Sequence, residues 1–212
     1  MVDLYVRPEK VYFRVHKNMV CKVEYFHKML HGGFTEASSS SANFPDDCSV
    51  AFDVLSWIYH GTLRRLEIVD VVGNTYRTNW VIPETYALAE KLCLPELQDL
   101  IMSTAMEWWR SSNLVPTNDL VDIAYQKTSQ NSPLRKYMVR VFGWRLLKCR
   151  AEYCSTASLH SLLKENDDLS IDFLTLLRQG HDFQFPGLYS NCEFHCHANN
   201  KVCMEMSWSS DR

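Results

Sequence analysis

The sequence predicts an α+β fold, with a small sheet near the N-terminus followed by packed helices. Two short segments rich in β-branched and aromatic residues come first, and segments with a helical spacing of apolar residues follow them. The chain has 212 residues, of which 46% are hydrophobic and 12% aromatic, so it can bury a substantial core. We expect one domain with an extension, because two separate cores would each be thin.

Residues 2–6 and 11–15 are predicted to form a β-hairpin. Both segments are rich in Val, Tyr and Phe, and the charges and proline of residues 7–10 suit the turn between them. Phe13 and Val15 alternate with Tyr12 and Arg14, so we expect one face of the second strand to be buried. Residues 42–45 are predicted to add a third short strand.

A helix is predicted over residues 18–31. Asn18 suits its N-cap, and Gly32-Gly33 ends it. The four serines of residues 38–41 are expected to form a flexible connection. The apolar side chains that repeat at helical spacing in this segment are Val20, Val23, Phe26 and Leu30.

Three further helices are predicted before residue 110. Asp46-Asp47 places negative charge at the start of the first, which Gly61 ends. Pro83 and Pro95 open the other two, since proline is tolerated at the first helical position. A variable stretch that contains Gly73-Asn74 separates Gly61 from Pro83.

Residues 111–179 continue as helices. Asn118 is expected to cap one helix and Pro133 to open a second, within which Gly143 indicates close packing of two helices. The last helical stretch ends near Gln179. After Gly180 the periodicity fails, and residues 180–212 form an irregular segment that contains Cys and His.

Four motifs occur in a fixed order in the first half of the chain. They are Phe13-Arg14-Val15-His16-Lys17, Gly32-Gly33-Phe34-Thr35-Glu36, Trp57-Ile58-Tyr59-His60-Gly61-Thr62-Leu63 and Ala87-Leu88-Ala89-Glu90-Lys91-Leu92-Cys93-Leu94-Pro95-Glu96-Leu97.

In order and spacing these motifs resemble the BTB/POZ domain. The resemblance covers roughly residues 2–110 and implies a short three-stranded sheet with packed helices, used for protein–protein interaction. The helices of residues 111–179 resemble the all-α extension of small BTB proteins from filamentous fungi. The expected organisation is therefore a BTB/POZ domain over 1–110, a helical extension over 111–179 and a Cys/His-containing tail over 180–212.

The resemblance also implies a partner-binding segment. In BTB adaptors that recruit cullin scaffolds, a hydrophobic-x-Glu motif follows this helix, and Phe34 and Glu36 match it. The alternative is that Phe34 covers the domain's own core. BTB domains also pair with themselves through a segment before the first strand; here only Met1 and Val2 precede Asp3, so a homodimer stays an open expectation. Asp3 is expected either to pair with His16 or Lys17 across the hairpin or to be, like them, an ordinary solvated charge.

The tail contains the sharpest chemical pattern of the chain. Thiolates and imidazoles this close can bind zinc tetrahedrally. Structural zinc sites usually offer two separated ligand pairs, whereas these donors share one short loop, so a strand or disordered tail with incidental Cys and His is the other reading. The possible ligands are Cys192, His195 or His197, Cys196 and Cys203. We expect no resident cofactor, with zinc as the alternative.

Several function classes are disfavoured. A net charge of −3 provides no basic field for nucleic acid, and no stretch approaches the apolar length that crosses a membrane. The sequence contains no Gly-x-Ser-x-Gly elbow, no phosphate-binding glycine loop and no His-Glu-x-x-His motif, so we expect no enzyme. Eight cysteines without a signal peptide indicate an intracellular protein of the cytoplasm or nucleus.

The expected function is therefore protein–protein interaction, through self-association or as a substrate adaptor of a cullin-type ubiquitin ligase. Two alternatives stay open: a metal-binding regulator that works through its tail, and a BTB scaffold with no ligase link.

Overall fold

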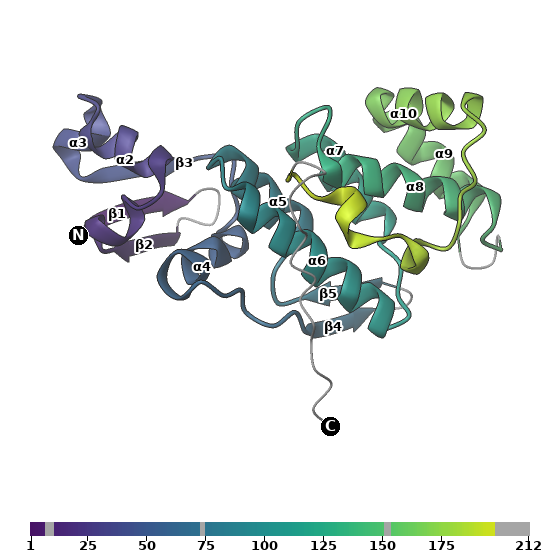
Figure 1. Ribbon diagram of the computed structural model, residues 1–212, viewed down its shortest axis with the longest axis horizontal. Helices are drawn as coiled ribbons and strands as arrows, with labels where there is room; N and C mark the ends of the chain where they lie inside the picture. Colours follow the sequence, from purple (N-terminus) through teal and green to yellow (C-terminus); the bar gives the residue numbers. More distant parts are fainter. Residues whose placement is uncertain (7–10, 73–74, 151–153, 198–212) are drawn as a thin grey trace.

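The computed structural model describes residues 1–6, 11–72, 75–150 and 154–197. These residues form an elongated α+β molecule, with a small sheet at one end and a group of helices at the other (Figure 1). One cluster of buried hydrophobic side chains extends through the molecule from Val2 to Phe194. The mixed fold class predicted from the sequence is confirmed.

The N-terminal sheet contains the predicted hairpin and third strand. Strand β1 (Val2–Val6) pairs antiparallel with β2 (Val11–Val15) and parallel with β3 (Ser41–Phe44), in the order β2-β1-β3. Val2, Leu4 and Val6 are buried, as the alternation along a strand requires. On β2, Val15 is buried and the half-buried Phe13 stacks on Phe52 at a centroid distance of 5.1 Å.

The helix predicted over residues 18–31 is broken in two. Helix α1 (Lys17–Val20) ends in a turn, and α2 (Glu24–His31) begins after Val23, which has extended backbone angles (φ −85°, ψ 124°). A β-branched residue favours that conformation. Val20, Val23 and Phe26 are still all buried, so two short helices satisfy the same apolar spacing.

Two other predictions about this region are wrong. Most of the serine run lies in regular elements, because residues 35–39 form α3 (Thr35–Ser39) and Ser40 turns the chain through a left-handed conformation into β3. Asp46-Asp47 lies in a turn before the 3-10 helix η1 (Ser49–Asp53) and α4 (Val54–His60). Asp47 pairs with Lys91 at 2.6 Å instead of starting a helix.

Gly61 ends α4 as predicted, in the left-handed region at φ 73°. The variable stretch that follows contains an antiparallel strand pair, β4 (Ile68–Val72) and β5 (Thr75–Thr78), which the sequence analysis missed. Gly73-Asn74 lies outside the described residues. Val69 and Val71 are exposed, so this hairpin lacks the buried alternating face by which a strand is recognised.

The next two helices are α5 (Ile82–Lys91) and α6 (Pro95–Ser111); Pro95 begins α6 as predicted, and Pro83 is the second residue of α5. The two helices pack against each other in the middle of the molecule (Figure 1). On α6 the fully buried tryptophan is Trp109, whose Nε1 donates to Tyr76 Oη at 2.9 Å. This bond ties the β4–β5 hairpin to α6.

The far end of the molecule is helical. Thr117, not Asn118, caps the first of these helices, since its Oγ1 accepts a hydrogen bond from the Leu120 backbone N–H. On the next helix Arg135 is buried and donates to the carbonyl oxygens of Tyr125 and Thr128, both at 2.6 Å. The helices of this end are α7 (Asn118–Lys127), α8 (Pro133–Leu147), α9 (Thr156–Glu165) and α10 (Asp167–Arg178).

After α10 the chain runs back toward the middle of the molecule as a C-terminal segment, residues 180–197 (Figure 1). It contains the 3-10 helices η2 (Pro186–Leu188) and η3 (Asn191–Phe194), both of which contact α6 and α8. Gly143 of α8 lies against Phe183 of this segment, so the close packing predicted at Gly143 involves the segment and not a second helix.

None of the helices in the described ranges combines the length and apolar character needed to cross a membrane.

Candidate functional site

Phe34 lies in an exposed position near one end of the molecule. It occupies the N-cap position of α3, directly after the Gly32-Gly33 turn that ends α2 (Figure 1 labels α2 and α3). Its side chain is 60% exposed, so Phe34 does not cover the core. A Cβ atom on Gly32 would lie only 2.9 Å from the Phe34 ring, which shows that the ring rests against the Gly32 backbone.

Glu36, the other residue of the predicted partner-binding pair, is half-buried in the first turn of α3. Its Oε2 accepts a hydrogen bond from Thr35 Oγ1 at 3.1 Å. An aromatic side chain and a carboxylate therefore lie two residues apart on a short, ordered segment.

The ion pair predicted for Asp3 has a different partner. Asp3 pairs with Arg14 across the hairpin, at 2.8 and 2.9 Å, and not with His16 or Lys17. The Arg14 hydrogen bond lowers the pKa of Asp3 below its usual value. His16 Nδ1 instead lies 3.1 Å from Tyr59 Oη.

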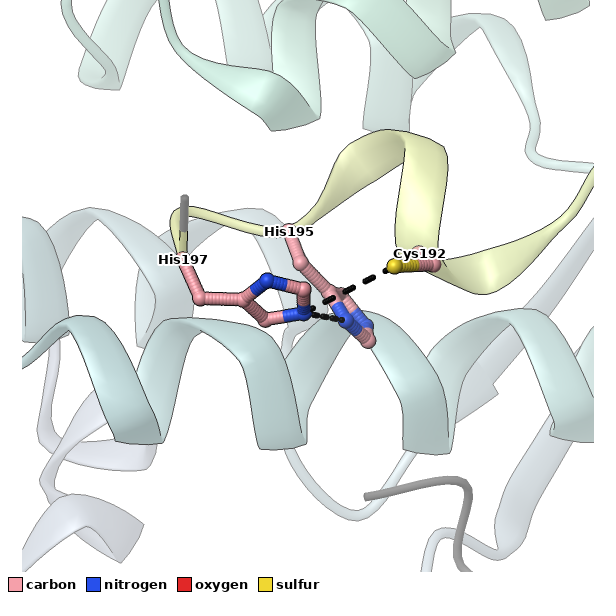
Figure 2. Close-up of side chains that lie close together, drawn as sticks. All are labelled: Cys192, His195 and His197. Atoms are coloured by element: carbon pink, nitrogen blue, oxygen red, sulfur yellow. Dashed lines mark hydrogen bonds between the residues drawn. The ribbon is translucent and has the colours of Figure 1, made fainter. Parts of the chain in front are cut away.

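Three side chains of the C-terminal segment converge on one point, as Figure 2 shows. They are Cys192, His195 and His197, and their donor atoms all lie within 4.8 Å of one another. His197 Nε2 lies 3.1 Å from His195 Nδ1 and 3.7 Å from Cys192 Sγ. Because one thiol and two imidazoles are the donors that zinc prefers, this cluster can hold a metal ion.

The core holds the backbone beneath the cluster. Phe194, between Cys192 and His195 in sequence, is fully buried and packs edge-on against Tyr137 of α8 at a centroid distance of 5.2 Å. The Arg140 guanidinium lies over the Phe194 ring and pairs with Glu193. The residues around the cluster are thus anchored on α8.

Helix α6 supplies polar contacts to the same region. Ser103 Oγ lies 2.9 Å from His195 Nε2, the ring nitrogen that points away from the cluster. The Cys196 backbone N–H donates to Asp99 Oδ1 at 2.5 Å. These contacts hold the C-terminal segment on α6 through His195, a possible ligand, and through the neighbouring Cys196.

Burial has the largest effect on the pKa values of His195 and Cys196. It lowers the pKa of His195, against the opposing effect of the Asp99 carboxylate, and so favours the neutral imidazole. Burial likewise raises the pKa of the Cys196 thiol and favours its protonated form.

Only some of the zinc ligands predicted from the sequence lie close together in the structure. Cys196 faces away from the cluster, with its Sγ 3.6 Å from Tyr86 Oη. Cys203 lies outside the described residues. Both histidines take part, whereas the sequence pattern had left them as alternatives. In sequence the signal is Cys-x-x-His-x-His, which the 3-10 turn of η3 folds into a triangle of donors.

Comparison with known proteins adds no assignment: no family model matches the chain, and no curated protein is significantly similar to it in sequence.

Proposed function

We propose that this chain is a BTB/POZ-type protein-interaction module that serves as a substrate adaptor for a cullin-type ubiquitin ligase. The observation that carries the proposal is the exposed Phe34 ring, two residues before the Glu36 carboxylate and directly after α2. The parallel β3 strand beside the β1–β2 hairpin and the glycine-terminated α4 support a scaffold of this type.

Phe34 has the properties of an anchor for a small interface. A phenylalanine that is 60% exposed offers a large apolar area to a partner. Because the ring rests on the Gly32 backbone, less side-chain entropy is lost when a partner covers it. The Glu36 carboxylate adds a negative charge that fixes the orientation in which the partner binds.

Binding of the purified chain to a cullin tests the proposal. We expect Phe34→Ala to weaken binding at least ~10-fold and Glu36→Gln to weaken it less, since truncation of an anchor residue typically costs ~1–2 kcal/mol or more. Leu188→Ala is the matched control, because Leu188 is 70% exposed and lies in η2, far from α3.

If Phe34→Ala binds as tightly as the unchanged protein and the Leu188→Ala control, the adaptor proposal is wrong. A molar mass measured in solution for the same three proteins determines whether the chain also pairs with itself.

A further inference from the structure

Two of the three donor–donor distances in the Cys192–His195–His197 cluster match a tetrahedral zinc site. With Zn–N bonds of ~2.05 Å and Zn–S bonds of ~2.3 Å, tetrahedral geometry places two nitrogens ~3.3 Å apart and sulfur and nitrogen ~3.6 Å apart. The two distances in the structure are 3.1 Å between His195 Nδ1 and His197 Nε2, and 3.7 Å between Cys192 Sγ and His197 Nε2. The third pair of donors, on Cys192 and His195, lies within 4.8 Å, so one ion fits among the three donors after this pair closes by up to about 1 Å.

Ser103 orients one of these ligands. In the tautomer that carries its proton on Nε2, His195 donates to Ser103 Oγ at 2.9 Å, and the lone pair of Nδ1 then faces Cys192 and His197. Metal-bound histidines usually donate their other ring N–H to a neighbouring acceptor in this way, which fixes the ring and raises its basicity as a ligand. The α6 hydroxyl provides that acceptor.

The structure also answers the objection that the donors share one short loop. A loop alone loses conformational entropy when it closes around an ion, but η3 is already anchored by the buried Phe194 ring and by the Arg140–Glu193 ion pair. The ligand at position 192 lies before this anchor, and the ligands at 195 and 197 lie after it. The folded chain thus positions the donors before an ion binds.

We propose that Cys192, His195 and His197 bind one zinc ion, with Ser103 as the residue that positions His195. Zinc fits one thiolate and two imidazoles, whereas Ca²⁺ and Mg²⁺ require oxygen donors. On binding, the Cys192 thiol releases its proton to solvent and both imidazoles bind as neutral groups. Three protein donors leave the fourth tetrahedral position for water or for a donor outside the described residues.

Zinc binding to the full chain, measured by metal content after native purification and by titration of Zn²⁺ against a competing chelator, tests this proposal. We expect one zinc per chain and loss of that site in Cys192→Ser and in His197→Gln. Cys196→Ser and Cys93→Ser are the matched controls, because Cys196 faces Tyr86 and Cys93 is an exposed thiol two residues after the end of α5. Both controls should bind zinc like the unchanged protein.

Cobalt substitution reports the ligands directly. Tetrahedral Co²⁺ bound to the protein should show a thiolate charge-transfer band that disappears in Cys192→Ser and persists in Cys196→Ser. Circular dichroism and thermal unfolding in chelator verify that each variant is folded. Because Cys192 is exposed, Cys192→Ser should match the metal-free unchanged protein in both measurements.

Ser103→Ala should weaken zinc binding ~10–100-fold, the usual effect of removing such a supporting hydrogen bond, and Ser103→Thr should restore it. The proposal is overturned if Cys192→Ser and His197→Gln bind zinc as the unchanged protein does, or if Cys196→Ser loses the ion as they do. Phe34→Ala should bind zinc normally, so this test is independent of the cullin experiment.

Discussion

Substitution of Gly143 by alanine tests how the C-terminal segment is attached to the helices. Gly143 lies inside α8, where alanine is ordinarily favoured over glycine by up to ~1 kcal/mol. A Cβ atom at this position would lie 2.2 Å from Cε1 and 2.3 Å from Cδ1 of Phe183. Unstrained carbon contacts are ~3.5–4.0 Å, so the ring would have to move by more than an ångström.

The Phe183 ring has little room for such a movement. It is 2% exposed and is packed against Phe173 and His181, with ring centroids 5.8 and 4.9 Å away. Overpacking of a well-packed site costs ~1–3 kcal/mol, and a contact this short belongs in the upper part of that range. After the gain in helix propensity is subtracted, we expect Gly143→Ala to lower the free energy of unfolding by about 1–2 kcal/mol.

Urea unfolding of a double-mutant cycle separates the two effects. Phe183→Ala alone should cost ~3–5 kcal/mol, because it removes a buried ring. In that background the steric conflict is gone, so Gly143→Ala should become neutral or stabilising by up to ~1 kcal/mol, with a coupling of ~2–3 kcal/mol between the sites. A stabilising Gly143→Ala in the otherwise unchanged protein would refute this packing of the segment on α8.

Three further predictions follow from other contacts. Arg135→Met should lower the free energy of unfolding by ~2–4 kcal/mol in a urea titration, because it leaves the carbonyl oxygens of Tyr125 and Thr128 without their donor. Asp168→Asn removes only the half-exposed ion-pair partner of Arg135 and should cost less than ~1 kcal/mol in the same titration. Thr117→Ala should cost ~1 kcal/mol in thermal unfolding and Asn118→Ala clearly less, since the threonine caps α7. Burial lowers the pKa of His181 below its usual value of 6.5, so the unfolded chain binds more protons than the folded chain at low pH. The free energy of unfolding should therefore fall as the pH drops below about 6.5, and His181→Gln should flatten this part of the stability profile.

Local patterns in the sequence were sufficient for much of the fold. The β1–β2 hairpin, the two helices with proline in their first turn and the end of α4 at Gly61 all depend on interactions between residues close in the chain. Turn chemistry and the fixed φ of proline act at that range. The break between α1 and α2 was missed because the buried positions keep helical spacing across it.

The contacts of the candidate sites were less predictable. Asp3 pairs with Arg14, its direct neighbour across the hairpin, because strand register decides which charges meet. The exposed β4–β5 hairpin carried no buried alternation, so its strands resembled a loop. Among the described residues, sequence reasoning did propose the three clustered donors, but it could not choose between His195 and His197 or exclude Cys196.

The sequence by itself determined the α+β class, the order of most elements and the position of the Phe34–Glu36 segment after α2, since composition, turn residues and periodicity act locally. Only the tertiary structure decided that residues 180–197 return to α6 and α8, that Phe183 covers Gly143 and that Phe194 anchors the Cys/His cluster. These contacts join residues 40 to more than 90 positions apart, such as Ser103 and His195. Their free energy comes from burial against surfaces that exist only once the helices have packed, and no local pattern encodes those surfaces.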